Sequence, residues 1–571
     1  MKTTEICAAN AFMNRSNFRQ VLDCASPLAL FHRRRPNRKR QRTAALQDAG
    51  ASESLYAIRQ SSTLAVAFLL FALIAASLLL LCPPSAHAQG GVPLWTNRFE
   101  AGPSGGSYGI VVDNAGNVFV TGYSNDRGNE DYVTIKYSNA GLPLWTNWYS
   151  GPGNSGRAAA IAVDGSGNVF VTGESAATTD QFCWPSCFDY ATIAYSSAGV
   201  PLWTNRYDGP ENNYDSATAI AVDSSGNVFV TGYSRSGSDS LSDDYATIAY
   251  SSAGVPLWTN RYDGANGLDR AAGIVVDTSG NVFVTGISSE EATFDGNFED
   301  FATVAYSNAG VPLWTNRYDG PAQRSDEAGA IAVDISGNVF VTGRSFADFS
   351  NPINQDYATV AYSNSGEPLW TNRYDRSGGY ETPKAIAVDS SGNVFVTGGS
   401  AGANDFYWAT VAYSSAGVKL WTRLYKPPLG GGGEAIAVDR SGNVFVTGES
   451  GSGGATVAYS NSGVPLWTNR VANVYLSKMA VDRNGNVFVT GYSQNGTNYD
   501  FVTIKYSSSI PLPRVDFQKL NNQLVLSWTN AAFNLQSAPA LTATFTNIPA
   551  ATSPYTNSLT GPQQFFRLRS D

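Results

Sequence analysis

The chain has 571 residues, with 56 Gly, 29 Tyr, 28 Phe and 12 Trp but only 15% charged residues, a composition typical of pleated strands joined by tight turns. Residues 1–88 hold 11 basic and 4 acidic residues, so the totals of 37 and 46 leave 26 basic and 42 acidic residues, a formal charge of −16, for 89–571. An acidic surface repels phosphate backbones, which argues against nucleic acid as a partner.

Residues 1–88 read as a basic leader and signal peptide. A basic run ends at Arg42, an uncharged apolar stretch covers Thr63–Leu81, and Ala86-His87-Ala88 has the small-x-small pattern of a cleavage site. We expect cleavage before Gln89 and export to the extracellular space, the periplasm or the cell surface. An uncleaved membrane anchor is the alternative, because 19 apolar residues are long enough to span a bilayer. The unusual length of the leader leaves the true start codon open.

Three strings then recur eight times each, with an average period of about 53 residues, the size of a propeller blade. The first is GNVFVTG, whose Asn is residue 117, 168, 227, 281, 338, 393, 443 or 486. The second is LWT, whose Trp is residue 95, 145, 203, 258, 314, 370, 421 or 467. The third resembles DYATIAY and ends at Tyr137, Tyr195, Tyr250, Tyr306, Tyr362, Tyr413, Tyr459 or Tyr506.

Each period contains four predicted strands, A to D, typified by AIAVD, NVFVTG, YATIAY and PLWTN. Gly-bearing turns join A to B and C to D, and radial repetition of four-stranded sheets is a β-propeller. The array opens with a lone D strand at Pro93–Asn97 and ends with A, B and C strands at 479–506. Pairing these ends makes a one-plus-three blade that closes the ring and removes exposed edges. We therefore predict an all-β, eight-bladed propeller over 89–508.

The pattern AIAVD-x-x-GNVFVTG followed by DYATIAYS-x-x-G-x-P-L-W resembles the SBBP family of bacterial β-propeller repeats over about 92–506. That family name implies seven blades, so the count of eight departs from it. The spacing from Gly199 to Trp203 is similar to the tryptophan-docking motif of quinoprotein propellers, in which the Trp packs between blades. No vicinal cysteine pair accompanies it, so the resemblance implies packing and not a quinone cofactor.

Several kinds of catalytic chemistry are absent from the predicted mature chain. Both histidines, His32 and His87, lie in the leader, which excludes histidine-dependent nucleophilic catalysis and histidine metal sites. No recognised catalytic motif is present, so the sequence leans against an enzyme. Cys183 and Cys187 are the two cysteines left after the leader, and in an oxidising compartment we expect them to form a local disulfide.

Two recurring sets of aspartates have a structural interpretation. One set ends the A strand and caps a tight turn, although it could suggest calcium: Asp113, Asp164, Asp223, Asp277, Asp334, Asp389, Asp439 and Asp482. The other set heads strand C and reflects blade geometry, because a catalytic pair would be unique: Asp131, Asp189, Asp244, Asp300, Asp356 and Asp500. We expect no cofactor, with calcium as the one open possibility.

The predicted binding face is the end of the blades that carries the B–C loops. The offset from the Asn of strand B to the Tyr of strand C varies from 16 to 27 residues, whereas the A–B and C–D hairpins are constant in length. Acidic and aromatic residues in or beside these loops are the candidate ligand contacts: Trp184, Asp239, Asp243, Glu290, Glu291, Asp295, Phe298 and Trp408. Such residues can stack on sugars or anchor a protein, and carboxylate pairs can hydrolyse glycosides.

After Tyr506 the period stops, and the alternating segments QLVLSWT, FNLQSA and QFFRLRS predict a small β-rich module over 509–571. The sequence as a whole favours an exported scaffold that binds a protein or a polysaccharide through the B–C face. The alternatives are an extracellular carboxylate-dependent polysaccharide hydrolase or lyase and a structural component of the cell surface. The ligand, the oligomeric state and the role of the tail stay open.

Overall fold

The computed structural model describes residues 91–571 except 179–187, 238–241, 265–266, 290–298, 350, 352–353, 377, 403–404, 508–514, 521–522, 529–532, 541–543, 550, 559–563 and 571. The regular elements in this part of the chain are all strands. The chain divides into two compact units, one of which is Ala88–Ile510, while Pro511–Asp571 belongs to the other. Among the described residues, no helix has the length and apolarity needed to cross a membrane.

Thirty-two strands of the first unit fall into four classes that repeat along the chain. The A strands are β2 (Gly105–Val112), β6 (Gly156–Val163), β10 (Asp215–Val222), β14 (Asp269–Val276), β18 (Asp326–Val333), β22 (Tyr380–Val388), β26 (Gly433–Val438) and β30 (Tyr475–Val481). The B strands are β3 (Val118–Ser124), β7 (Val169–Ala176), β11 (Val228–Arg235), β15 (Val282–Ser289), β19 (Val339–Phe346), β23 (Val394–Ala401), β27 (Val444–Glu449) and β31 (Val487–Asn495).

The other two classes complete the blades. The C strands are β4 (Asp131–Tyr137), β8 (Phe188–Tyr195), β12 (Asp243–Tyr250), β16 (Glu299–Tyr306), β20 (Gln355–Tyr362), β24 (Phe406–Tyr413), β28 (Gly453–Tyr459) and β32 (Asn498–Tyr506). The D strands are β5 (Pro143–Tyr149), β9 (Pro201–Tyr207), β13 (Pro256–Tyr262), β17 (Pro312–Tyr318), β21 (Pro368–Tyr374), β25 (Lys419–Tyr425), β29 (Pro465–Ala472) and β1 (Pro93–Glu100).

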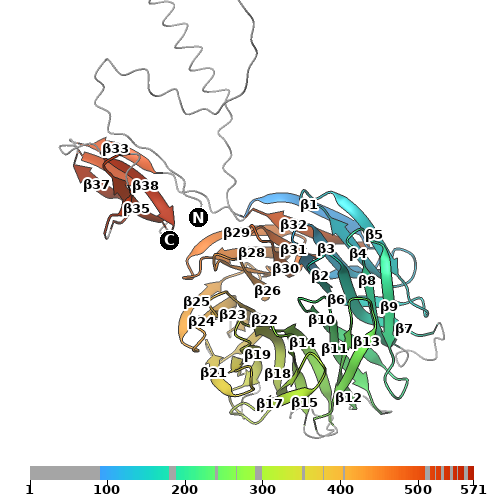
Figure 1. The fold of residues 1–571 in the computed structure, drawn as a ribbon. Coiled ribbons are helices and arrows are strands. Elements are labelled where there is room, and N and C mark those ends of the chain that lie inside the picture. Colours follow the sequence, from blue (N-terminus) through green and yellow to red (C-terminus); the bar gives the residue numbers. More distant parts are fainter. Residues whose placement is uncertain are drawn as a thin grey trace, which may run out of the picture. The chain divides into compact units, whose positions relative to one another are not determined.

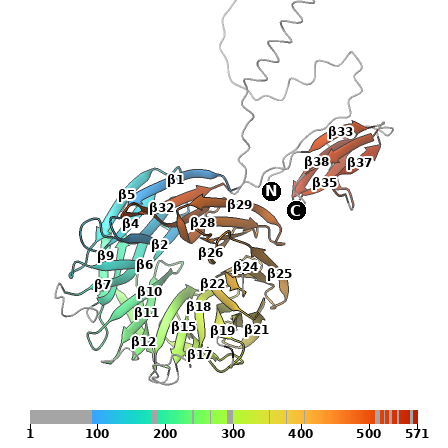
Figure 2. The same ribbon diagram turned by 180° about the vertical axis from the view of Figure 1, so that it is seen from behind.

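Strand pairing groups these elements into four-stranded antiparallel blades. Blades 1 to 7 run in chain order from β2–β5 to β26–β29, and blade 8 has the order β1-β32-β31-β30. A single parallel bridge between Gln355 and Tyr380 joins blades 5 and 6. The A strands surround the centre of the ring and the D strands form its rim (Figures 1 and 2). Each A strand contacts the next, and β30 contacts β2, so the ring is closed and the predicted all-β propeller fold is confirmed.

Closure depends on strands from the two ends of the propeller segment. β1 pairs antiparallel with β32, from Pro93 opposite Tyr506 to Glu100 opposite Asp500. This is the pairing expected from the order of strings along the chain. It gives the edge of β32 a hydrogen-bonded partner. An unpaired edge would be able to pair with a strand of another molecule.

The hydrophobic core lies between the blades. B strands are buried on both sides, whereas the D strands alternate between exposed and half-buried residues because only one side faces the neighbouring blade. One core cluster, for example, joins Phe170 and Tyr190 of blade 2 to Val228, Val230 and Ile248 of blade 3. Blades therefore pack face to face, as the sequence predicts for β-branched runs.

Tryptophans of the D strands connect successive blades. Seven of them donate the indole N–H to a carbonyl in the C–D turn of the next blade, as Trp203 does to Ser252 at 3.0 Å. The ring also lies against the turn glycine, since a β-carbon on Gly254 would come within 2.5 Å of Trp203. Gly254 has a φ of +79°, a conformation that glycine adopts without strain. This is the interblade packing implied by the tryptophan-docking spacing.

The eighth tryptophan docks across the closure. Trp467 lies against Gly91, and the Asn469 side chain donates to the Gly91 carbonyl at 2.9 Å, as Asn205 does to Gly254 at 2.7 Å. Gly91 thus replaces a turn glycine, although it precedes β1 in the chain. The Trp467 indole N–H has no hydrogen-bond partner among the described residues; the residue equivalent to Ser252, Gln89, lies outside them.

The second unit contains two small antiparallel sheets. One has the order β33 (Asp516–Leu520), β34 (Gln523–Ser527) and β37 (Tyr555–Ser558), and the other has β36 (Thr546–Asn547), β35 (Phe533–Ala538) and β38 (Phe565–Ser570). Buried side chains include Leu526, Trp528, Leu535 and Phe566. The alternating tail segments therefore form β structure, as the sequence predicts.

Candidate ligand site at the mouth of the channel

A β-bulge near the start of every A strand determines what lines the central channel. In blade 1 the pairing register passes from Ser107 to Gly109 and skips Tyr108, and the other seven blades have a register shift at the equivalent position. A bulge changes the direction of the skipped side chain, which no longer follows the alternation of side chains between the two faces of the sheet. The skipped residues differ from blade to blade: Tyr108, Ala159, Thr218, Ala272, Gly329, Lys384, Glu434 and Ser477.

The glycine of each VTG string allows this bulge. A β-carbon on Gly232 would lie 2.0 Å from the carbonyl oxygen of Ser216, and the equivalent approach in the other blades is 1.8 to 2.1 Å. No side chain tolerates such a distance, so glycine is required where the A strand comes close to the B strand. The residue after each VTG string is again variable: Tyr123, Glu174, Tyr233, Ile287, Arg344, Gly399, Glu449 and Tyr492.

These two variable positions line a cavity in the channel. It has a volume of about 430 Å³ and is bounded by blades 1, 2, 3 and 8. A cavity of this size is within the range of small-ligand sites. Its polar and aromatic lining includes Tyr108, Tyr123, Arg157, Glu174, Tyr233 and Lys478.

Tyrosine rings dominate this side of the channel mouth. Tyr108 stacks on Tyr123 with a centroid distance of 5.8 Å and an interplanar angle of 16°, and 44% of Tyr108 is exposed. Tyr475 and Tyr492 form a second stack at 5.2 Å and 23°. Burial and the neighbouring Tyr123 raise the pKa of Tyr108, so its hydroxyl stays protonated at neutral pH and is able to donate a hydrogen bond.

Charged groups hold these rings in place. Arg157 forms two hydrogen bonds with the Glu130 carboxylate, at 2.6 and 2.8 Å, and its guanidinium lies 5.1 Å from the centre of the Tyr123 ring. Tyr214 donates a hydrogen bond to Glu174. Lys478 faces the cavity from blade 8. The site therefore combines flat aromatic surface with fixed hydrogen-bond donors and acceptors.

The opposite side of the ring has a different lining. A second cavity of about 380 Å³ lies between blades 4, 5 and 6, and Glu327, Arg344 and Lys384 contribute charges to it. Arg344 and Glu327 form an ion pair. The eight blades share a backbone but not a channel surface, because tyrosines line the first cavity and not the second.

Two of the predicted contact residues are described, and the structure corrects their placement. Asp243 is fully buried, because it pairs in register with Arg235 and accepts hydrogen bonds from Arg235 and Arg270 at 2.6 to 2.9 Å. Trp408 is 1% exposed and donates its indole N–H to the Glu449 carbonyl at 2.9 Å. Neither side chain is on an exposed face.

The sequence already contained a signal for Trp408. When the repeats are aligned on ATVAY, Trp408 stands where four other blades have a fully buried tyrosine such as Tyr245 or Tyr357. Its partner in the register is Gly399, which has no side chain to occupy the same space. The remaining candidates lie outside the described residues, as do both cysteines of the predicted disulfide: Trp184, Asp239, Glu290, Glu291, Asp295, Phe298, Cys183 and Cys187.

Variation in loop length, on which the predicted binding face depends, does not identify the channel residues. Tyr108 and Tyr123 lie within strings of constant length, immediately before GIVVD and immediately after VTG. Variation in residue type inside an otherwise repeated string was the signal that could have found them. The inner strands of the blades surround the axis of a propeller, so such positions on different blades meet at the channel.

The recurring aspartates mostly have the structural roles predicted for them. Each A-strand aspartate accepts two backbone N–H groups of its turn, as Asp223 does from Ser225 and Asn227 at 2.8 Å. Five strand-C aspartates form ion pairs with an arginine of the D strand in the same blade: Asp189, Asp244, Asp300, Asp356 and Asp500. The described residues that could hold a metal ion are groups of three carboxylates that include four of these aspartates.

Two segments match the SBBP beta-propeller repeat. They are residues 206–237 and 472–500, which run from a D strand through the following A and B strands of blade 3 and from the end of blade 7 into blade 8. The resemblance inferred from the repeated strings is thereby confirmed. No curated protein matches the chain.

Solved structures similar to this one include several β-propellers. The Dos1 propeller has 8% sequence identity and a TM-score of 0.45, with 72% of this chain and 94% of that chain covered. Sqt1 from Chaetomium thermophilum has 8% identity and a TM-score of 0.45, covering 71% and 96%. The β-propeller domain of the Trilobed protease from Pyrococcus furiosus has 8% identity and a TM-score of 0.37, covering 62% and 95%.

Proposed function

We propose that the protein is an exported binding scaffold that takes up a polysaccharide or oligosaccharide at the tyrosine-rich half of its channel mouth. The observation that carries this proposal is the cavity of about 430 Å³ with the exposed Tyr108 ring on its wall. Export is supported by the basic run, the apolar stretch and the Ala86-His87-Ala88 sequence of the leader.

Sugars are the ligands best matched to this lining. A pyranose ring presents C–H groups on its faces and hydroxyl groups around its edge, so it stacks on aromatic rings and exchanges hydrogen bonds with charged side chains. The Tyr108–Tyr123 stack offers the ring surface, while Arg157 and Glu174 offer a donor and an acceptor beside it.

Glycan binding is tested on the purified full chain. A glycan array would identify a ligand, and titration calorimetry would then compare wild type with Tyr108→Ala. Loss of a stacking ring costs about 1.4 kcal/mol, so we expect affinity to fall about tenfold. Ile335→Ala is the matched control, because Ile335 is an exposed apolar residue in an A–B turn, at the opposite end of the blades.

The outcomes separate the candidate functions. Unchanged affinity in Tyr108→Ala, or equal loss in Ile335→Ala, would contradict binding at this mouth. If the wild type binds no glycan but binds a protein, and Tyr108→Ala weakens that binding, the ligand of this site is a protein. Cleavage of a bound polysaccharide would indicate the extracellular hydrolase or lyase.

A further inference from the structure

Three carboxylates meet at each of four consecutive blade interfaces. The first heads a C strand, the second lies in the D–A loop that follows, and the third begins the A strand of the next blade. Within each group, one oxygen of every residue lies within 4.8 Å of the others. The groups, which we call the interface triads, are Asp189-Asp208-Asp215, Asp244-Asp263-Asp269, Asp300-Asp319-Asp326 and Asp356-Asp375-Glu381.

The third carboxylate of each interface triad is buried and incompletely bonded. Asp215, Asp269 and Glu381 are 0% exposed and Asp326 is 1% exposed. In each of them one oxygen has no hydrogen-bond partner: Oδ1 of the three aspartates and Oε2 of Glu381. A buried carboxylate oxygen without a partner is costly, so each of these sites lacks a group that would satisfy it.

The unpartnered oxygen is directed toward the D–A loop. In the first interface triad, Asp215 Oδ2 accepts the Gly209 N–H at 2.8 Å, and a β-carbon on Gly209 would lie 2.9 Å from Asp215 Oδ1. Gly264 and Gly320 have the same relation to Asp269 and Asp326. The preceding residue, Asp208, is exposed, so the D–A loop brings one solvent-facing carboxylate to the two buried ones.

The first carboxylate of each interface triad already has a charged partner. One arginine of the D strand, such as Arg206, pairs with it. A divalent cation would supply the partner that the buried oxygen of the third carboxylate lacks.

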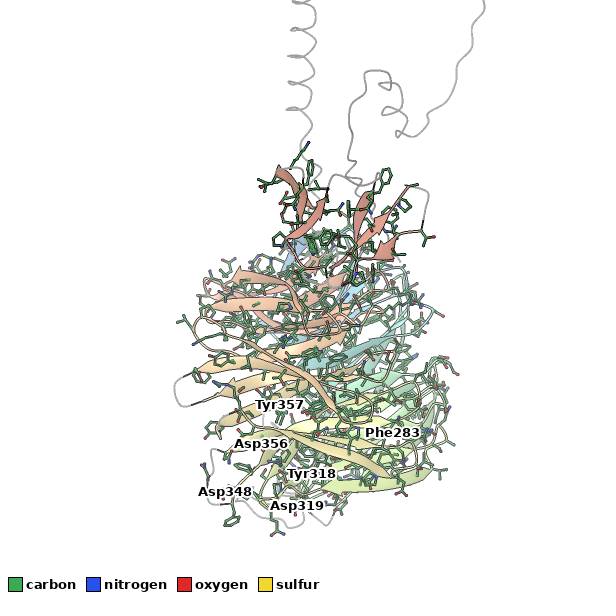
Figure 3. The ribbon with its side chains drawn as sticks, turned by 90° about the vertical axis from the view of Figure 1, so that its left-hand side faces the viewer. Phe283, Tyr318, Asp319, Asp348, Asp356 and Tyr357 are labelled. Carbon is green, nitrogen blue, oxygen red and sulfur yellow. The ribbon has the colours of Figure 1, made fainter. Side chains whose placement is uncertain are left out.

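We propose that the four interface triads are calcium sites that link the C strand of one blade to the A strand of the next. The donors are all oxygens, which hard cations prefer, and Ca²⁺ places its ligands at about 2.4 Å and therefore up to about 5 Å apart. The span of 4.8 Å within each group fits that geometry. Asp319 and Asp356, from two neighbouring interface triads, lie on the same face of the ring, opposite the end marked by Phe283 (Figure 3).

The interface between blades 1 and 2 lacks such a triad and is an internal comparison for the other four interfaces. There Asp131 heads the C strand, but Ser150 stands in place of the loop carboxylate and Gly156 in place of the buried one. One carboxylate cannot form the three-oxygen site. We therefore expect calcium at the four interfaces between blades 2 and 6 and not at this one.

The test is calorimetric titration of the full chain with CaCl₂ after removal of metal by a chelator, with thermal unfolding in parallel. We expect a stoichiometry near four and a higher melting temperature with Ca²⁺ than with chelator. Asp208→Asn, an exposed and structurally tolerant change, should reduce the stoichiometry by one. Asp131→Asn is the matched control and should leave the stoichiometry unchanged.

Three results would overturn the proposal. The first is a wild type that shows neither calcium-dependent heat nor a shift in melting temperature. The second is an unchanged stoichiometry in Asp208→Asn, and the third is an equal loss of calcium sites in Asp131→Asn. Binding of Mg²⁺ in preference to Ca²⁺ would likewise contradict the assignment of calcium. None of these results depends on whether the channel mouth binds a glycan.

Discussion

The aspartate at the end of each A strand shows how one residue fixes a turn. Asp223 Oδ1 accepts the N–H groups of Ser225 and Asn227, and Oδ2 accepts the side-chain amide of Asn227, all at 2.8 Å. The same three bonds occur in all eight blades. The constant offset of four residues between Asp and Asn follows from this geometry.

At the residue scale we predict that Asp223→Ala destabilises the propeller by about 1–3 kcal/mol, because two backbone N–H groups and one side-chain amide lose their acceptor. The denaturant midpoint measures this change. Ser224→Ala, in the same turn, alters an exposed side chain and should shift the midpoint by less than about 0.5 kcal/mol. Equal effects of the two substitutions would contradict the capping role.

Closure is a property of one element, β1. Trp95 and Phe99 from this strand pack against the core cluster of blade 1, which also contains Phe488 and Phe501 of blade 8. Without β1, blade 8 would have three strands and the edge of β32 would be unpaired. The order of strings along the chain was enough to predict this pairing, since the only unpaired D strand is at the start and the only blade that lacks one is at the end.

At the element scale we predict that a chain beginning at Ala101 is less stable than one beginning at Gln89 and self-associates. Loss of two partly buried aromatic side chains alone costs about 2–4 kcal/mol, and the exposed β32 edge is a template for pairing between molecules. Denaturant unfolding and light scattering check the two effects. A monomeric truncated chain with an unchanged midpoint would show that β1 does not close the ring.

The whole molecule repeats one buried tyrosine at the end of every C strand. Tyr137, Tyr306, Tyr362 and Tyr459 have pKa values raised to about 12, mainly because burial disfavours the phenolate. Burial also raises the pKa of the four equivalents: Tyr195, Tyr250, Tyr413 and Tyr506. Because the ring consists of equivalent interfaces, these effects add over the molecule.

At this scale we predict steep alkaline unfolding above pH 10. Unfolded tyrosines ionise near pH 10, whereas the folded ones stay protonated to a higher pH, so the unfolded state binds fewer protons and stability falls as the pH rises. A two-unit shift corresponds to a loss of about 2.7 kcal/mol per tyrosine, most of it reached by pH 12. Tyrosinate absorbance and circular dichroism should change together. Complete ionisation near pH 10 with intact circular dichroism would contradict the prediction, and Tyr195→Phe should reduce the slope.

The sequence alone determined the propeller, its order of strands, the closure by β1 and the capping role of the turn aspartates. Each of these depends on spacing within a repeat or on order along the chain, which are visible in one dimension. It did not determine which side chains face solvent. Asp243 and Trp408 were interpreted as loop contacts, and register with Arg235 and Gly399 buries them instead.

Only the tertiary structure brought together residues that are distant in the chain. Tyr108 and Lys478 share a cavity because the blades that carry them are joined by closure, and Asp189 meets Asp215 because successive blades pack face to face. In both cases each residue lies within an ordinary strand pattern, and its neighbours come from another repeat. A periodic sequence shows what every blade has in common, whereas the candidate ligand and metal sites arise where unlike residues of different blades converge.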